Sequence, residues 1–256
     1  MTDILSILSG AAVGLILALI GGGGSILATP ALLYIVGVAN PHVAIGTSAL
    51  AVSVNAFANF INHARRGNVK WRCAAIFAGA GVVGAALGAA LGKLTDARIL
   101  LPLFAVLMIV IGVRMLRTQS HEGDADVRLS ATNAPRLMFA GVIVGALSGF
   151  FGIGGGFLIV PGLIAASGMT MIHAVGSSLF AVGAFGATTA TSYAIDGLID
   201  WRVALLFIGG GLIGGALGAM LSSRLAKQKG ALQRLFAIVV FAVAAYMLWR
   251  SLGASV

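Results

Sequence analysis

The sequence is poor in charge and contains a single cysteine. Only 9% of its 256 residues are charged, against about a quarter in an ordinary soluble domain, which excludes a water-soluble globular fold. The lone Cys73 excludes an intramolecular disulfide framework and a cysteine-based metal site. The chain is instead 59% apolar and holds 37 glycines, a composition typical of closely packed transmembrane helices.

Charged side chains are confined to short clusters between apolar runs. All seven acidic residues and all sixteen lysines and arginines fall in expected loops or at helix ends, so none is expected at mid-membrane depth. The net charge of +9 is therefore typical of membrane-flanking loops and does not indicate a nucleic-acid partner. The apolar runs offer neither paired carboxylates for acid–base catalysis nor a metal cluster. We expect no enzyme activity, no metal and no cofactor.

Apolar runs of about 20 residues, the length of a helix that crosses a bilayer, occur six times. They cover residues 42–63, 72–93, 98–117, 172–195, 202–223 and 231–250. Two further apolar stretches, 4–37 and 136–168, are too long for one crossing and are interrupted by glycines. The pieces on either side have about 12–17 residues, which favours half-helices that meet within the bilayer. The predicted fold is an all-α polytopic membrane protein with about eight spans.

Four sequence blocks recur in the same order at an offset of about 130 residues. The pairs are GGGGSILATP (21–30) with GIGGGFLIVP (152–161), AIGTS (44–48) with AVGSS (174–178), GNVKWR (67–72) with GLIDWR (197–202), and GAALG (84–88) with GGALG (214–218). Ordered blocks at nearly constant spacing indicate duplication. We expect a first transmembrane repeat at 1–117, a polar linker at 118–135 and a second transmembrane repeat at 136–256.

Loop charges favour inverted repeats. The loops at 65–72 and 224–234 are strongly basic, whereas their counterparts in the other half are not. Under the positive-inside rule, equivalent loops then lie on opposite membrane faces. This holds if each glycine-broken stretch re-enters and is followed by three transmembrane helices, with both termini outside and the linker cytoplasmic. If each broken stretch were one kinked crossing, the repeats would be parallel, against the charges.

The glycine-broken stretches are the sharpest candidate for a binding site. A half-helix that starts at Ile26 or Phe157 would present unpaired N–H groups and its positive dipole end to the bilayer middle, where anions bind. Paired interruptions of this kind mark the substrate site in transporters built from repeats. The alternative is that the glycines only permit tight helix crossings.

Hydroxyls and amides are placed to line the same site. Thr47-Ser48 and Ser177-Ser178 open two equivalent helices, and three asparagines form a polar stripe on the first of them. The alternative for both groups is structural, through bonds to backbone carbonyls or to a neighbouring helix. The residues predicted to bind substrate are Gly21, Gly22, Gly23, Gly24, Ser25, Thr47, Ser48, Asn55, Asn59, Gly152, Gly154, Gly155, Gly156, Ser177 and Ser178.

Other motifs are expected to be structural. His42 and His173 stand near the expected membrane surface, where a structural role is favoured over proton coupling. The GxGxxG patterns at 79–84 and 209–214 have the spacing of dinucleotide-binding loops, but both lie inside apolar runs. Packing of small residues between helices explains them better.

Three of these motifs, each present twice, resemble the TauE/SafE family of sulfite exporters and toluene-sulfonate-uptake permeases. They are the glycine-rich break followed by proline, the A-[IV]-G-[ST]-S segment and the G-x-x-x-W-R entry. The resemblance covers the chain except the linker. It implies a protein of the bacterial inner membrane that moves sulfur-containing anions such as sulfite, sulfonates or thiosulfate, with the substrate near the glycines and hydroxyls named above. The breaks differ, GGGGS against GIGGG, so the half-sites need not be equivalent.

The favoured hypothesis is a secondary transporter or facilitator of a small anion, working by alternating access at the repeat interface. Its partners would be the anionic solute and the lipid bilayer, and a homo-oligomer is left open. A non-transporting scaffold or biogenesis factor is the main alternative. An intramembrane enzyme is disfavoured because the serines have no evident base nearby.

Overall fold

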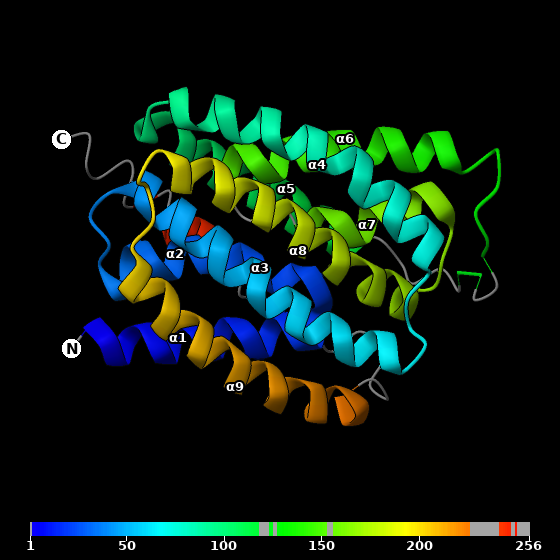
Figure 1. Ribbon diagram of the computed structural model, residues 1–256, viewed down its shortest axis with the longest axis horizontal. Helices are drawn as coiled ribbons and strands as arrows, with labels where there is room; N and C mark the ends of the chain where they lie inside the picture. Colours follow the sequence, from blue (N-terminus) through cyan, green and yellow to red (C-terminus); the bar gives the residue numbers. More distant parts are fainter. Residues whose placement is uncertain are drawn as a thin grey trace.

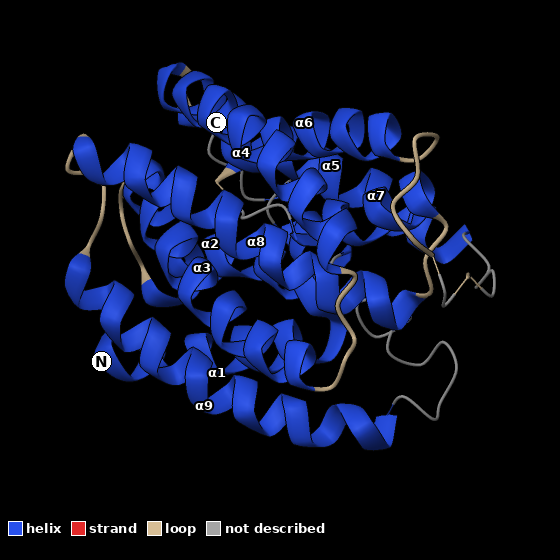
Figure 2. Ribbon diagram, turned by 45° about the vertical axis from the view of Figure 1, so that its right-hand side comes forward, coloured by secondary structure: helices blue, strands red, loops and turns tan. Residues whose placement is uncertain are grey.

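The computed structural model describes residues 2–117, 123–124, 127–152, 156–225, 241–246 and 249. Over these residues the chain is a bundle of helices joined by short loops (Figure 2). The elements are α1 (Thr2–Ile20), the 3-10 helix η1 (Gly21–Leu27), α2 (Ala28–Ala31), the π-helix η2 (Leu32–Val36), α3 (Pro41–Arg65), α4 (Trp71–Leu94), α5 (Ala97–Arg117), α6 (Ala134–Phe151), α7 (Gly156–Ser167), α8 (Met171–Ile195) and α9 (Trp201–Leu225). The all-α polytopic fold is confirmed.

The predicted helices agree closely with the observed ones. The runs 42–63, 72–93, 98–117, 172–195 and 202–223 correspond to α3, α4, α5, α8 and α9, whereas most of 231–250 lies outside the described residues. Six described helices are long and apolar enough to cross a membrane, namely α1, α3, α4, α6, α8 and α9. Local chemistry fixes their ends: α3 begins where the Asn40 side chain accepts the N–H of His42 at 2.9 Å, with Pro41 at the first helical position.

The first arm of each glycine-broken stretch is longer than the half-helix expected. α1 has 19 residues and α6 has 18, about 28 Å of helix each, because both continue without a break until the glycines. The return arms are short: η1, α2 and η2 follow α1, and the 12-residue α7 follows α6. In the first stretch Val36 and Gly37 come back to the same surface hollow as Thr2 and Asp3. The chain therefore enters and leaves on one side.

The two ends of the bundle are distinguished by where the helices begin. α1, α3 and α9 begin at one end, which we name the N-terminal face (left in Figure 1). α4, α6 and α8 begin at the other end, which we name the linker face (right in Figure 1). Both ion pairs that the described residues make lie at the N-terminal face: Lys93 with Asp196, and Arg202 with Asp3 at 2.7 Å. Which face is cytoplasmic remains a prediction from the loop charges.

The sequence halves are interleaved. The first helix of each half packs along the third long helix of the other half, α1 on α9 and α6 on α4, while α3 and α8 pack against each other (Figure 1). Glycines allow the backbones to touch: a Cβ added at Gly84 would overlap the carbonyl oxygen of Val142, and one at Gly214 would overlap that of Ala11. The GxGxxG patterns therefore lie inside α4 and α9, where their second and third glycines serve helix packing as predicted. A Cβ at the first glycine of each, Gly79 or Gly209, would meet nothing within 4 Å.

Candidate functional site

The two glycine-broken stretches meet inside the bundle. η1 packs against α7, and the backbone N–H of Gly156, the first residue of α7, donates a hydrogen bond to Ser25 Oγ at 3.2 Å. Ser25 is completely buried. The meeting point thus joins a residue of the first half to the start of a helix in the second half. We name Ser25 and the Gly156 N–H the central contact.

The two breaks differ in form. α6 ends at Gly152, whose φ of +65° lies in the left-handed region that favours glycine, and α7 starts afresh at Gly156. In the first half no helix begins at Ile26, because the 3-10 turns of Gly21–Leu27 run on directly into α2, which has four residues. The expected free helix terminus at Ile26 is therefore wrong. The α7 start lies one residue before the expected Phe157, and Gly154 and Gly155 lie outside the described residues.

Packing alone demands glycine at two of the predicted site positions. A Cβ at Gly24 would come within 2.4 Å of the backbone nitrogen of Leu17 on α1, and one at Gly152 would overlap Cγ2 of Ile45 on α3. The backbone of α1 leaves no room for a side chain at Gly24, and at Gly152 the left-handed φ of +65° adds strain to the overlap with the Ile45 side chain. At these positions the packing alternative is sufficient, and Gly21, Gly22 and Gly23 form the first turn of η1. Whether a ligand also approaches the glycines stays a prediction.

The paired hydroxyls divide into two kinds. Thr47 Oγ1 accepts the N–H of Asp200 at 2.9 Å, and Ser177 Oγ accepts the N–H of Lys70 at 3.0 Å. Each bond ties the start of α3 or α8 to the loop that precedes a long helix of the other half. Gly46 and Gly176 allow the close approach, since a Cβ at either would overlap a carbonyl oxygen of the same loop. We name these two bonds the loop locks.

The second hydroxyl of each pair lies among the buried elements. Ser48 Oγ donates to the carbonyl of Ile45 at 2.9 Å and lies 2.8 Å from Thr29 Oγ1 on α2, whereas Ser178 Oγ donates to the carbonyl of Val175 at 2.8 Å. All three hydroxyls are buried. Sequence reasoning missed Thr29, although it stands in the repeated GGGGSILATP block, because its counterpart in the second half is an apolar valine.

Asn55 and Asn59 face the glycines of α9. A Cβ at Gly211 would overlap the Asn55 amide, and one at Gly215 would lie 2.9 Å from Asn59 Nδ2. Asn59 Nδ2 donates to the Asn55 carbonyl at 3.0 Å, but both amide atoms of Asn55 itself are buried and make no hydrogen bond with any described residue. Unpaired buried amides are rare and mark strain or an unseen partner. The structure does not join this pair to the central contact by any hydrogen bond among the described residues.

The predicted structural roles of the histidines are consistent with their contacts. His173 Nδ1 lies 2.7 Å from Thr170 Oγ1 at the start of α8, and His42 packs 6.4 Å from the ring of Tyr193. Among the described residues no group of three or more histidine, cysteine, aspartate or glutamate side chains is placed to hold a metal.

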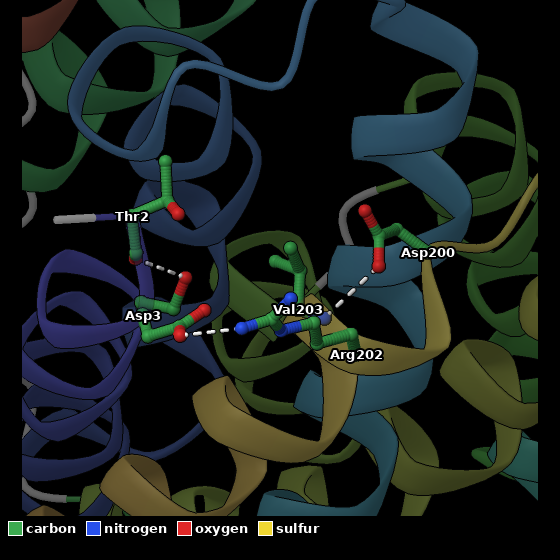
Figure 3. A network of polar contacts seen from close by, with 6 residues as sticks. Thr2, Asp3, Asp200, Arg202 and Val203 are labelled. Carbon is green, nitrogen blue, oxygen red and sulfur yellow. Dashed lines mark hydrogen bonds and ion pairs between the residues drawn. The ribbon is translucent and has the colours of Figure 1, made fainter.

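Each face carries a hollow near one loop lock. At the N-terminal face a hollow of about 460 Å³ is lined by Asp3, Asn40, Asp200 and Arg202, with Asp3 and Arg202 pointing toward one another (Figure 3). At the linker face a hollow of about 390 Å³ is lined by Lys70, the residue whose N–H forms the other lock, and by its neighbours. Between the hollows the hydroxyls of Ser25, Ser48 and Ser178 are fully buried, so the centre is closed to both faces.

The loop locks are predicted to stabilise this closed form. Thr47→Val keeps the shape of the side chain but leaves the Asp200 N–H without its acceptor, and Ser177→Ala does the same to Lys70. Each loss costs about 1–3 kcal/mol where the donor is buried. We expect each variant to speed thiol labelling of a cysteine placed at Ser48 or Ser178, from the face whose lock is lost. Equal labelling from both faces in both variants would contradict separate locks.

Sequence similarity to known proteins extends over nearly the whole chain. The family model described as "Sulfite exporter TauE/SafE" matches residues 6–247. A "Probable membrane transporter protein" of Xylella fastidiosa (strain Temecula1 / ATCC 700964) is 53% identical over 249 residues, which are 97% of this chain and 95% of that protein. The "Probable membrane transporter protein YunE" of Bacillus subtilis (strain 168) is 27% identical over 246 residues, 88% of this chain and 90% of that protein. No solved structure matches.

Proposed function

Since this chain belongs to the sulfite exporter TauE/SafE family of membrane transporters, we propose that it carries a small sulfur-containing anion across the bacterial inner membrane by alternating access. The membrane transporter itself follows from the family and from the multi-pass helical fold. The substrate class and the mechanism are the proposal, and so is the binding site around the central contact.

The observation that carries the proposal is a buried, uncharged set of hydrogen-bond donors where the two broken stretches meet. The Gly156 N–H and the hydroxyls of Ser25 and Ser48 lie deep between the two halves. Backbone N–H groups at a helix start and hydroxyls are the donors that oxyanions accept from. Because no fixed cation faces them among the described residues, binding would be modest, about 0.3–1 kcal/mol for each helix-end interaction and up to about 2 kcal/mol when partly buried. Weak binding suits a site that must release its substrate.

The loop locks supply two barriers for alternating access. Thr47 with Asp200 lies toward the N-terminal face, and Ser177 with Lys70 lies toward the linker face. Opening one while the other stays closed would expose the centre to one side at a time. The structure then corresponds to the state in which both are closed.

A non-transporting scaffold remains the second candidate, because packing alone explains Gly24 and Gly152. An enzyme has less support, since Ser48 and Ser178 bond to backbone carbonyls of their own helices rather than to a base. The scaffold predicts no solute dependence, so a transport measurement separates the two.

The direct test is flux into proteoliposomes. Sulfite, thiosulfate and a short sulfonate would be compared with chloride, with and without a pH gradient and against protein-free vesicles. Saturable flux of one sulfur anion is the expected result, and its dependence on the gradient would identify proton coupling. Absence of flux for all three, from protein verified as folded, would reject the substrate class.

The central contact can be tested by removing its hydroxyl. Ser25→Ala removes the hydroxyl that accepts the Gly156 N–H, and we expect sulfite flux to fall about tenfold, because the O–H of Ser25 is itself a donor that an oxyanion would use. Ser6→Ala is the matched control, since Ser6 is an equally buried hydroxyl that donates within α1, to the carbonyl of Thr2 at 2.8 Å. Equal flux from both variants would contradict the assignment of Ser25.

A further inference from the structure

The hollows at the two faces differ in charge although they lie at corresponding places in the two halves. The hollow at the linker face is lined by Lys70, Arg72 and Arg128, and none of the described residues that line it is acidic. The hollow at the N-terminal face is lined by Arg202 together with Asp3 and Asp200. The charged side chains that line the linker-face hollow are therefore all cationic, whereas those that line the N-terminal-face hollow are two carboxylates and one guanidinium.

The repeated W-R motif shows how the difference arises. Arg202 is neutralised by Asp3, whose Oδ2 lies 2.7 Å from the guanidinium (Figure 3). Arg72 is its counterpart in the first half, and it makes no ion pair with any described carboxylate. Arg128 and Lys70 likewise have no carboxylate partner among the described residues. Three cations without a carboxylate partner in the described part of the chain, around a hollow of about 390 Å³, attract anions far more strongly than paired cations do.

We propose that the hollow at the linker face is an oxyanion-binding vestibule. Lys70, Arg72 and Arg128 provide charge, and guanidinium groups also hold two oxygens of one oxyanion at once. The ligand is a compact oxyanion of the sulfate or phosphate type. The vestibule deepens the proposed function, because it stands beside the lock formed by Lys70 and Ser177 and would concentrate substrate on that side.

An oxyanion of this type can reach the linker face from two sources. One is the free anion in solution, and the other is the phosphate of an anionic lipid, since basic pockets near a membrane surface also hold headgroups. Trp71 lines the same hollow and is 58% exposed. The rate at which a cysteine at this position is modified therefore depends on whether an anion occupies the hollow. Trp201, its counterpart in the second half, is 60% exposed and provides a matched control position on the opposite face.

The test uses the full chain with Cys73→Ala and a single new cysteine, Trp71→Cys or Trp201→Cys. In neutral detergent, the rates of modification by an anionic and by a cationic methanethiosulfonate would be compared. We expect the ratio of anionic to cationic rate to be roughly tenfold higher at 71 than at 201. Sulfate should slow labelling at 71, more than chloride at equal ionic strength does. Arg72→Gln with Arg128→Gln should remove both effects, and each single change should weaken them if the double variant does not fold.

The lipid arm repeats the labelling in vesicles of phosphatidylcholine with and without phosphatidylglycerol. Protection by sulfate in phosphatidylcholine identifies a free-anion site, whereas protection that needs phosphatidylglycerol and ignores sulfate identifies a headgroup site. Equal rate ratios at 71 and 201, with no protection by either, would overturn the vestibule. Failure of sulfite flux would reject the proposed function and leave this result untouched, so the two failures are distinguishable.

Discussion

Asn55→Leu is expected to leave the protein folded and to reduce transport at least tenfold. The side chain is 1% exposed on α3, and over the part of the chain that the structure describes neither atom of its amide makes a hydrogen bond. Burying an unpaired polar group costs about 1–3 kcal/mol. Leucine has nearly the same branched shape without the polar atoms. The free energy of unfolding of the variant should therefore equal or exceed that of the native protein. A residue that costs stability inside a membrane bundle is best explained by a role in function.

The second half of the chain shows that the position does not require an amide for folding. The counterpart of Asn55 is Phe185, which is fully buried and faces Gly81 as Asn55 faces Gly211. An apolar side chain therefore fits between helices at the equivalent crossing. The polar Asn55 and its apolar counterpart Phe185 are therefore consistent with a substrate-binding amide that is present in only one half.

Two measurements on Asn55→Leu distinguish a functional amide from a structural one. One is sulfite flux, and the other is thermal unfolding followed with a thiol-reactive dye, which the lone Cys73 permits because it is 1% exposed. Asn62→Leu is the control, since it makes the same change on the same helix at a partly exposed position. Lost flux with an unchanged unfolding temperature supports a functional amide. Full flux would mean that the asparagines only join helices.

The length and repetition of apolar runs predicted most of the fold because a bilayer imposes one helix length. The same reasoning made α1 and α6 half-helices, although they run for 19 and 18 residues up to the glycines. It also treated the two breaks alike, whereas the backbone turns left-handed at Gly152 and continues into 3-10 turns at Gly21. The periodic glycines also identified packing faces, but a stripe of small residues does not say which helix it meets. The pairing of α1 with α9 became visible only in three dimensions.

The candidate site was predicted as a set of residue types and not as contacts. Thr47 and Ser48 are neighbours with similar chemistry, yet one holds a loop and the other lies beside Thr29. Helical geometry separates adjacent side chains by about 100°, so which of the two faces inward depends on how the helix is rotated by its partners. A single sequence does not contain that rotation. Composition likewise could not show that the Asn55 amide has no hydrogen-bond partner among the residues described in the structure.

Gly214→Val is expected to destabilise the fold severely. A Cβ at this position would overlap the backbone carbonyl of Ala11, and backbone does not move aside as a flexible side chain does. Overpacking of a tight core costs about 1–3 kcal/mol, and more where backbones must separate. We expect loss of folded protein, or a fall of roughly 5–10 °C in unfolding temperature by the Cys73 dye assay. Gly84→Val, which meets Val142 in the corresponding crossing of the other half, should behave alike.

Gly209→Ala isolates packing from helix propensity, because a Cβ at Gly209 meets nothing within 4 Å although it lies on the same helix. This change should leave the unfolding temperature unchanged or raise it, since alanine is favoured over glycine in a helix by about 1 kcal/mol. The same logic applies to Gly79 on α4. If Gly214→Val were as stable as Gly209→Ala, α1 would not be held against α9. If it is not, we propose that α1 moves with α9 and α6 with α4 during transport, while α3 and α8 move relative to both pairs at the loop locks.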